Sequence, residues 1–155
     1  MRIAPGLGVV VTGGAGDIGG AIARELLGYE AHLTLLDRRP RADVARILSE
    51  LGAVEYAQVD VRDSDSVAAA LADVDPLDVV VGNAAVVESA PFLEISAEQW
   101  RTQLDVNLTG CFNVGQAAAR LMVDRGRPGR VIFTSSWVQD VAWPESAPTP
   151  CRRQG

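Results

Sequence analysis

The chain contains 155 residues, of which 48% are hydrophobic and 22% are charged, which suffices for one globular domain with its own core. Its formal net charge is −6. This acidic balance argues against a nucleic-acid partner, because binding to a phosphate backbone depends on clustered basic residues.

The two cysteines, Cys111 and Cys151, form neither a disulfide framework nor a metal cluster. We therefore expect a reducing, cytoplasmic setting and no bound metal. The N-terminal sequence MRIAPGLGVVVTGG lacks the apolar core and cleavage site of a signal peptide. No apolar run reaches eighteen residues, so no membrane span is expected.

The first half of the chain alternates between β-branched apolar runs and amphipathic segments. The apolar runs predict strands at 8–12, 32–37 and 55–60. Apolar residues three and four positions apart predict a helix over 18–27, which ends at Gly28, and Pro40 with Arg41 opens a second helix that continues to Leu51.

The second half repeats this alternation. Asp63 is placed to cap a short helix over 65–71, and strands are predicted within 77–85 and 130–136. Between these strands, Ser96 and Gln99 form a capping box for a helix that continues, or bends near Gly110, and ends near Asp124.

Strands that alternate with helices indicate right-handed βαβ units and a parallel sheet with helices on both faces. We predict a doubly wound α/β (Rossmann) fold with strand order 3-2-1-4-5, which stops after the fifth strand. The expected domain covers residues 1–144, and the Pro-rich residues 145–155 are expected to be an aberrant, disordered tail.

The segment TGGAGDIGG lies between the first predicted strand and helix. Gly14, Gly16 and Gly19 fit the pattern G-x-G-x-x-G, in which glycines permit a tight turn, close approach of a pyrophosphate and close helix packing. The N–H groups and dipole at the helix start favour phosphate. The alternative interpretation is a glycine-rich turn without function.

Asp37 ends the second predicted strand, twenty-one residues after Gly16. A carboxylate here can accept hydrogen bonds from both hydroxyls of the adenosine ribose and repels a 2′-phosphate, which favours NAD over NADP. Arg38, Arg39 and Arg41 crowd the same corner and are able to pair with a phosphate. Alternatively, Asp37 is a solvated turn residue beside three arginines.

In this order, the motifs resemble those of the classical short-chain dehydrogenase/reductase family. The resemblance rests on TGGAGDIG, Asp37, VDV at 59–61, GNAA at 82–85, DVNLTG at 105–110 and TSS at 134–136. It covers the chain up to about Pro144. It implies an NAD(P)-dependent oxidoreductase that interconverts a secondary alcohol and a ketone, and a homo-oligomer for the intact parent.

The resemblance also assigns roles by position. Cofactor contacts are implied for Gly13, Gly14, Gly16, Asp17, Ile18, Gly19, Asp37, Arg38, Asp60, Val61, Asn83 and Ala84. Of these, Asp60 accepts from the adenine amine. On the catalytic side, Ser136 bonds the substrate oxygen, and the Asn107 carbonyl holds a relay water. Purely structural roles remain open: Asn83 as a turn cap, Asn107 as a helix-bend residue and Ser136 as a strand-end hydroxyl.

The sequence departs from the family pattern in three places. Asp17 stands where the glycine turn usually has Gly, and GNAA replaces the usual NNAG. The third departure concerns the Tyr and Lys that serve as acid and base in this family. Their expected positions, thirteen and seventeen residues after Ser136, hold Thr149 and Arg153, so we expect little or no turnover from this chain.

Synonymous codons for the last eight residues, PTPCRRQG, can encode Tyr at position 149 and Lys at position 153 when read in another frame. One hypothesis is therefore that the tail is a frameshifted reading of an ordinary Y-x-x-x-K segment. The competing hypothesis is a non-catalytic dinucleotide-binding module or an inactive pseudogene product. Either way, an uncovered fifth strand predicts low solubility.

Overall fold

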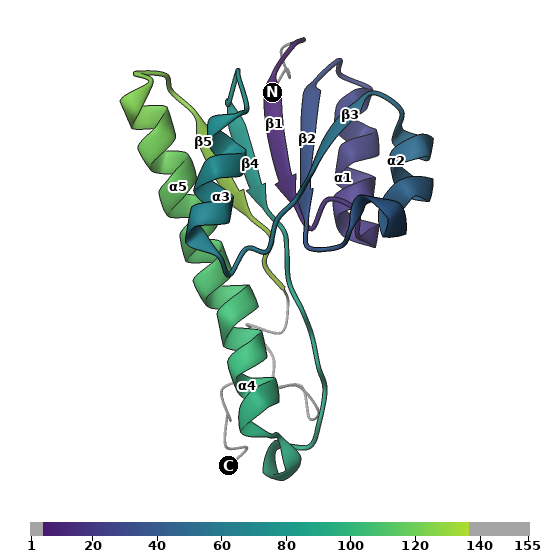
Figure 1. Cartoon of the computed structure of the whole chain (residues 1–155), viewed down its shortest axis with the longest axis vertical. Helices are drawn as coiled ribbons and strands as arrows, with labels where there is room; N and C mark the ends of the chain where they lie inside the picture. Colours follow the sequence, from purple (N-terminus) through teal and green to yellow (C-terminus); the bar gives the residue numbers. More distant parts are fainter. Residues whose placement is uncertain (1–4, 137–155) are drawn as a thin grey trace, which may run out of the picture.

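The computed structural model describes residues 5–136 of the chain (Figure 1). Five strands form one parallel sheet in the order β3-β2-β1-β4-β5, as predicted. The strands are β1 (Gly8–Thr12), β2 (His32–Asp37), β3 (Val54–Gln58), β4 (Val79–Gly82) and β5 (Arg130–Phe133). The predicted tail at 145–155 lies outside the described residues.

Helices cover both faces of the sheet (Figure 1). On one face lie α1 (Asp17–Leu27) and α2 (Ala45–Leu51), and on the other lie α3 (Ser64–Ala72) and α5 (Gly110–Asp124). Asp63 caps α3 as predicted, because its side chain accepts from two backbone N–H groups of the first turn. None of the described helices is long and apolar enough to cross a membrane.

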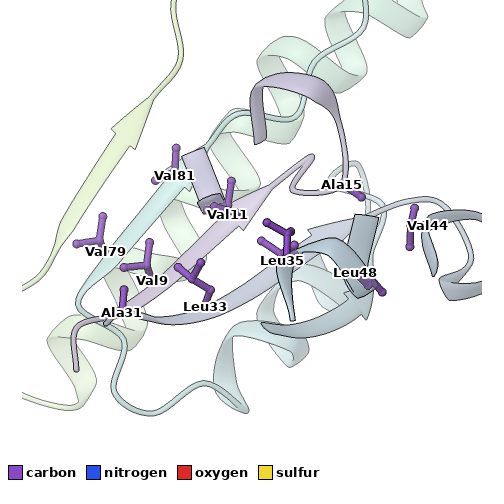
Figure 2. Close-up of a cluster of buried hydrophobic side chains, with 12 residues drawn as sticks. Val9, Val11, Ala15, Ala31, Leu33, Leu35, Val44, Leu48, Val79 and Val81 are labelled. Carbon is purple, nitrogen blue, oxygen red and sulfur yellow. The ribbon is translucent and has the colours of Figure 1, made fainter. Parts of the chain in front are cut away.

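The core has two layers, one on each side of the sheet. Val9 and Val11 of β1 point into the layer beneath α1 and α2, which also contains Leu33 and Leu35 (Figure 2). Val10 points the other way, into the layer beneath α3 and α5. All five residues of β1 are buried, as expected for a central parallel strand with both faces covered.

Between β4 and β5, a long continuous helical segment extends past the carboxyl ends of the strands (Figure 1). It consists of α4 (Ala97–Leu104), a π-helical turn (Asp105–Thr109) and α5. The capping box between Ser96 and Gln99 is present at its start. The helix therefore continues through Gly110, which is one of the two predicted alternatives, with a π-helical turn directly before this glycine.

Some predicted boundaries differ from the structure. The second predicted helix begins with a 3₁₀ turn over Arg41–Val44, and a further 3₁₀ turn forms at Phe92–Glu94. Strand β3 ends at Gln58 rather than Asp60, because its ladder with β2 ends where Asp37 pairs with Gln58. Likewise, β5 ends at Phe133, which pairs with Gly82 at the end of β4.

Strand β5 forms an edge of the sheet, next to β4. Its side chains are less covered than those of the other strands: Ile132 is 50% exposed and Phe133 is 47% exposed. Parallel sheets are normally covered on both faces. This edge is therefore an apolar surface that the described residues leave largely open to solvent.

Candidate nucleotide-binding site

A tight glycine turn connects the end of β1 to the start of α1. Gly13 adopts a positive φ of 62°, which L side chains rarely adopt. The N–H of Gly16 donates to the Gly13 carbonyl at 3.0 Å. Gly16 then caps α1 without any side-chain acceptor, so the N–H groups of the first helical turn remain available to an anion.

The start of α1 packs directly on this turn. A Cβ at Gly19 would lie 2.2 Å from the Gly13 carbonyl oxygen and 2.8 Å from the Gly14 Cα. Gly14 is buried against Leu35 of β2, and its N–H donates to the Leu36 carbonyl at 3.2 Å. Gly14 and Gly19 thus allow the helix, the turn and the sheet to approach closely.

A groove of about 710 Å³ opens at the carboxyl ends of the strands. It contains all the predicted cofactor contacts except Gly14, namely Gly13, Gly16, Asp17, Ile18, Gly19, Asp37, Arg38, Asp60, Val61, Asn83 and Ala84. Residues that the sequence interpretation had not singled out also line it, among them Thr102, Val106, Val86 and Glu88. Asn107 and Ser136 are not among the lining residues.

Asp37 is only 7% exposed, and its carboxylate is held by neighbouring donors. The Arg39 guanidinium donates Nε to Oδ1 and Nη2 to Oδ2, each at 3.0 Å. The backbone N–H groups of Arg39 and Ala15 also donate to this carboxylate, at 3.1 and 3.3 Å. Burial alone raises the pKa of Asp37, but these hydrogen bonds and the Arg39 charge outweigh it, so the pKa lies below the ordinary value.

Asp60, after β3, has the same kind of partner. The Arg62 guanidinium donates Nε to both carboxylate oxygens at 3.0 Å and Nη2 to Oδ2 at 2.6 Å. The hydrogen bonds from Arg62 lower the pKa of Asp60 in spite of the opposing effect of burial. Two D-x-R segments, Asp37 to Arg39 and Asp60 to Arg62, therefore form matching ion pairs at neighbouring strand ends.

The Thr12 hydroxyl lies at the centre of the sheet edge and is 1% exposed. It donates to the Val81 carbonyl at 3.3 Å and accepts from the N–H groups of Asn83 and Ala84 at 3.0 and 3.1 Å. The Asn83 side chain donates to the Thr12 carbonyl at 3.1 Å and accepts from the Thr134 hydroxyl at 3.2 Å. This network joins the ends of β1, β4 and β5.

Asn107 lies in the π-helical turn and holds the segment after β4. Its side chain accepts from the Val86 N–H and donates to the Val86 carbonyl, both at 2.8 Å. Isolated π-helical turns are frequent at functional sites. Ser136 is exposed and follows β5 at the same edge of the sheet.

Four residues that contribute to this region were not assigned these roles from the sequence: Thr12, Arg39, Arg62 and Asn113. The Asn113 amide, buried in α5, donates to the carbonyls of Val61 and Arg62 at 2.9 and 3.2 Å. The repeated D-x-R spacing was a visible signal for both ion pairs. In contrast, the sequence carries no mark that distinguishes Asn113 from other helical asparagines.

A parallel α/β sheet with a glycine turn and an uncapped helix start at its carboxyl edge defines a Rossmann-type fold. The chain belongs to the short chain dehydrogenase family, whose model matches residues 8–148.

Curated relatives and solved structures agree with this membership. The chain is 37% identical over 127 residues to L-xylulose reductase from Mesocricetus auratus. The aligned region covers 82% of this chain and 52% of that protein. It is 34% identical over 139 residues to carbonyl reductase [NADPH] 2 from Sus scrofa, and this alignment covers 90% of the chain and 57% of that protein. Thus the chain spans a little over half the length of these relatives.

The fold matches that of NAD⁺-bound xylitol dehydrogenase with a TM-score of 0.82 and 26% identity, over 92% of this chain and 58% of that one. Within residues 5–136, no group of three or more His, Cys, Asp or Glu side chains is arranged to hold a metal ion.

Proposed function

We propose that this chain is the dinucleotide-binding part of an NAD(P)-dependent oxidoreductase that interconverts a secondary alcohol and a ketone. The observation that carries the proposal is the groove of about 710 Å³, in which the glycine turn, Asp37, Asp60 and Asn83 come together. The membership of the chain in the short chain dehydrogenase family supports the same reaction class.

The residues of the groove fit an elongated dinucleotide. The uncapped start of α1 offers N–H donors to a pyrophosphate. Gly19 lets the helix approach the glycine turn closely, because a Cβ there would lie 2.2 Å from the Gly13 carbonyl oxygen. The Asp37 carboxylate accepts from a ribose hydroxyl, and Asp60 with Val61 borders the adenine. When bound, the nicotinamide supplies the hydride acceptor or donor. We expect NAD to be preferred to NADP, because Asp37 is an acid.

On the substrate side, Ser136 polarises the alcohol or carbonyl oxygen, and Asn107 orders a proton relay. The positions at which the family resemblance implies Tyr and Lys hold Thr149 and Arg153. A threonine hydroxyl is far too weak an acid to replace a tyrosine near neutral pH. The family match ends at residue 148, directly before Thr149. We therefore expect this chain to bind the dinucleotide with little or no turnover.

The substrate class is proposed from the relatives. The names L-xylulose reductase, gluconate 5-dehydrogenase and xylitol dehydrogenase all refer to sugars or their polyol and acid derivatives. A small polyhydroxylated alcohol or ketone is therefore the first substrate to test on the intact parent protein, which we expect to be a cytoplasmic homo-oligomer.

A second candidate function is a non-catalytic dinucleotide-binding module. Thr149 and Arg153 favour it, because they stand in place of the expected acid and base, whereas the predicted cofactor contacts line the groove. The two candidates differ in the encoding DNA: codons that yield Tyr and Lys in the other frame support the oxidoreductase, and codons that cannot yield them support the module.

The first experiment is a calorimetric titration of the 155-residue protein with NAD⁺, with and without Gly19→Ala. Saturable binding that this substitution weakens at least tenfold supports the groove as the cofactor site. Absence of binding by a protein with a cooperative unfolding transition overturns the proposal. An assay for NADH formation with xylitol then tests the expected lack of turnover.

A further inference from the structure

The loop after β3 carries Asp60, Val61 and Arg62, all of which line the groove. We propose that Asn113 of α5 is a positioning residue for the adenine of the dinucleotide, because its side-chain amide holds the backbone of this loop and thereby sets the place of the Asp60 carboxylate. The inference rests on the proposed function, in which Asp60 and Val61 border the adenine. It assigns to that site a residue that does not itself line the groove.

The loop lies beyond the hydrogen-bonded ladder of the sheet, because β3 ends at Gln58. Bonds within the loop are local. The backbone N–H of Arg62 donates to the Asp60 carboxylate, and the N–H of Asp63 donates to the Asp60 carbonyl, each at 3.0 Å. Such short-range bonds shape the turn. They do not fix where the turn lies relative to the body of the protein.

Asn113 makes bonds that do fix the position of the loop. Its side-chain nitrogen donates to the Val61 carbonyl at 2.9 Å and to the Arg62 carbonyl at 3.2 Å. These acceptors lie 52 and 51 residues away in the chain. Because Asn113 is buried, loss of the donor would leave its partners without compensation from bulk water. The amide therefore ties the loop to α5.

The contact between the loop and α5 is also closely packed. A Cβ at Gly110 would lie 2.6 Å from Val61 Cγ2 and 3.1 Å from Val61 Cβ, so the start of α5 touches the buried Val61 side chain directly. Gly110 stands three residues before Asn113, and residues with this spacing share one face of a helix. One face of α5 thus meets the loop twice, at the glycine and at the amide.

Packing of the core does not by itself call for an amide at this position. The buried residues that α5 contributes to the hydrophobic layer, Val114, Ala118 and Met122, are apolar. A buried amide costs free energy unless its polar groups find partners. Asn113 finds them in the two carbonyls that directly follow Asp60. Loss of the amide should therefore displace Asp60, and the effect should be visible in how the protein distinguishes one base from another.

The charges of the loop favour the same arrangement. The hydrogen bond to Asp60 makes the largest contribution to a raised pKa of Arg62, and the nearby charge of Asp105 raises this pKa further. Asp105 lies in the π-helical turn directly before α5. The loop is therefore attracted by its Arg62 charge to the same helical segment that binds its backbone through Asn113.

The test compares NAD⁺ with nicotinamide hypoxanthine dinucleotide, in which an oxygen replaces the exocyclic amine of the adenine. The Asp60 carboxylate can accept a hydrogen bond from the amine but faces another acceptor in the analogue. Each nucleotide is titrated by calorimetry into wild type, Asn113→Ala and Gln103→Ala of the 155-residue protein. The Kd ratio of the analogue to NAD⁺ is the readout. Circular dichroism and urea unfolding establish that each variant is folded.

Gln103→Ala is the matched control. Gln103 is also buried in the helical segment between β4 and β5, and its side-chain amide also donates to a backbone carbonyl. The acceptor is the Glu88 carbonyl at 3.2 Å, in the segment after β4 rather than in the loop after β3. The control therefore removes the same kind of bond without releasing the loop.

We expect a wild-type ratio of about ten or more, because a hydrogen bond to a charged group contributes at least this factor. Asn113→Ala should lower the ratio to below about three, mainly by raising the Kd of NAD⁺, because a displaced carboxylate no longer distinguishes the two bases. Gln103→Ala should keep the ratio within about twofold of wild type. If Asn113→Ala fails to fold, Asn113→Ser takes its place with the same expected ratio, since its hydroxyl is too short to reach both carbonyls.

Different results identify which proposal fails. A folded wild-type protein that binds neither nucleotide overturns the proposed function and this inference together. Binding of NAD⁺ and the analogue with equal affinity by wild type overturns the inference alone. So does a variant of Asn113 that is folded and keeps the wild-type ratio, even if it binds both nucleotides more weakly. An equal fall of the ratio in Gln103→Ala would also overturn it.

Discussion

Thr12 and Asn83 hold each other by reciprocal hydrogen bonds. The Thr12 hydroxyl accepts from the Asn83 N–H at 3.0 Å, and the Asn83 amide donates to the Thr12 carbonyl at 3.1 Å. Both residues stand where their strands end, at the edge that forms the groove. The pair therefore sets the spacing between β1 and β4 at the point where the candidate site begins.

Thr12→Val should destabilise the protein by about 2 kcal/mol, because it leaves the partly buried N–H groups of Asn83 and Ala84 without their acceptor. Urea unfolding measures the change. Thr134→Val is the matched control, since Thr134 is exposed and loses a single bond to Asn83, so it should cost less than about 0.5 kcal/mol. Equal effects of the two substitutions would contradict the central role of Thr12.

Gly19→Ala should lower the free energy of unfolding by about 2 kcal/mol, because its Cβ would lie 2.2 Å from a backbone oxygen that cannot rotate away. Gly28→Ala is the control: its Cβ would lie 3.2 Å from the Glu25 carbonyl oxygen, and its φ of −62° is helical. Thermal or urea unfolding of both variants measures the difference, and a smaller loss in Gly19→Ala than in Gly28→Ala would contradict the close packing of α1 on the turn.

Acid should remove part of the stability that Asp37 supplies. The pKa of Asp37 is lowered in the folded state. As the pH falls through about 4, this carboxylate therefore takes up a proton more readily in the unfolded chain than in the folded one. The stability that Asp37 supplies is thus complete only above that pH and is lost progressively below it. Asp37→Asn should therefore be less stable than wild type by about 1–2 kcal/mol at pH 7. Urea unfolding at pH 7, 5 and 3.5 should show this gap narrowing toward low pH, whereas a gap independent of pH would exclude the ion pair as its cause.

Asn107→Ala should loosen the segment after β4, because two hydrogen bonds to the Val86 backbone are lost. We expect amide exchange at Val86 to accelerate by at least about tenfold, which corresponds to roughly 1.4 kcal/mol of local stability. Asn113→Ala serves as the control, since Asn113 contacts the carbonyls of Val61 and Arg62 instead. Exchange at Val86 that responds equally to both variants would contradict the assignment.

Self-association should decrease when the exposed face of β5 is made polar. Ile132 is 50% exposed on the edge strand, and lysine on an edge strand opposes pairing with other chains. Light scattering over a range of concentrations should show less association for Ile132→Lys than for wild type. Val123→Lys makes the same charge change at an apolar residue of α5 that is 77% exposed. A decrease of the same size in this control would point to net charge rather than the strand edge.

Local signals predicted much of this fold. The β-branched run at Gly8–Thr12 and the spacing of Gly14, Gly16 and Gly19 indicated a strand, a turn and a helix, and the strand bounds were correct. The capping box at Ser96 and the cap at Asp63 were also correct, because such hydrogen bonds join residues only two or three positions apart. The predicted ends of β3 and β5 were less accurate, because each strand ends where its pairing with the neighbouring strand ends.

The sequence by itself determined the order of elements, the parallel sheet and the acids at the ends of β2 and β3, because these depend on local propensity and on the handedness of βαβ units. Only the tertiary structure decided that Thr12 and Asn83 link the ends of β1, β4 and β5, that the Asn107 side chain bonds the Val86 backbone, and that Tyr56 and Gln58 bond the loop after β2. Thr12 and Asn107 meet partners far away in the chain. Arg39 is close enough to Asp37 in sequence for the D-x-R spacing to signal the ion pair. However, the carbonyls of Arg39 and Arg38 accept from Tyr56 and Gln58 of a neighbouring strand, and no local pattern records those contacts.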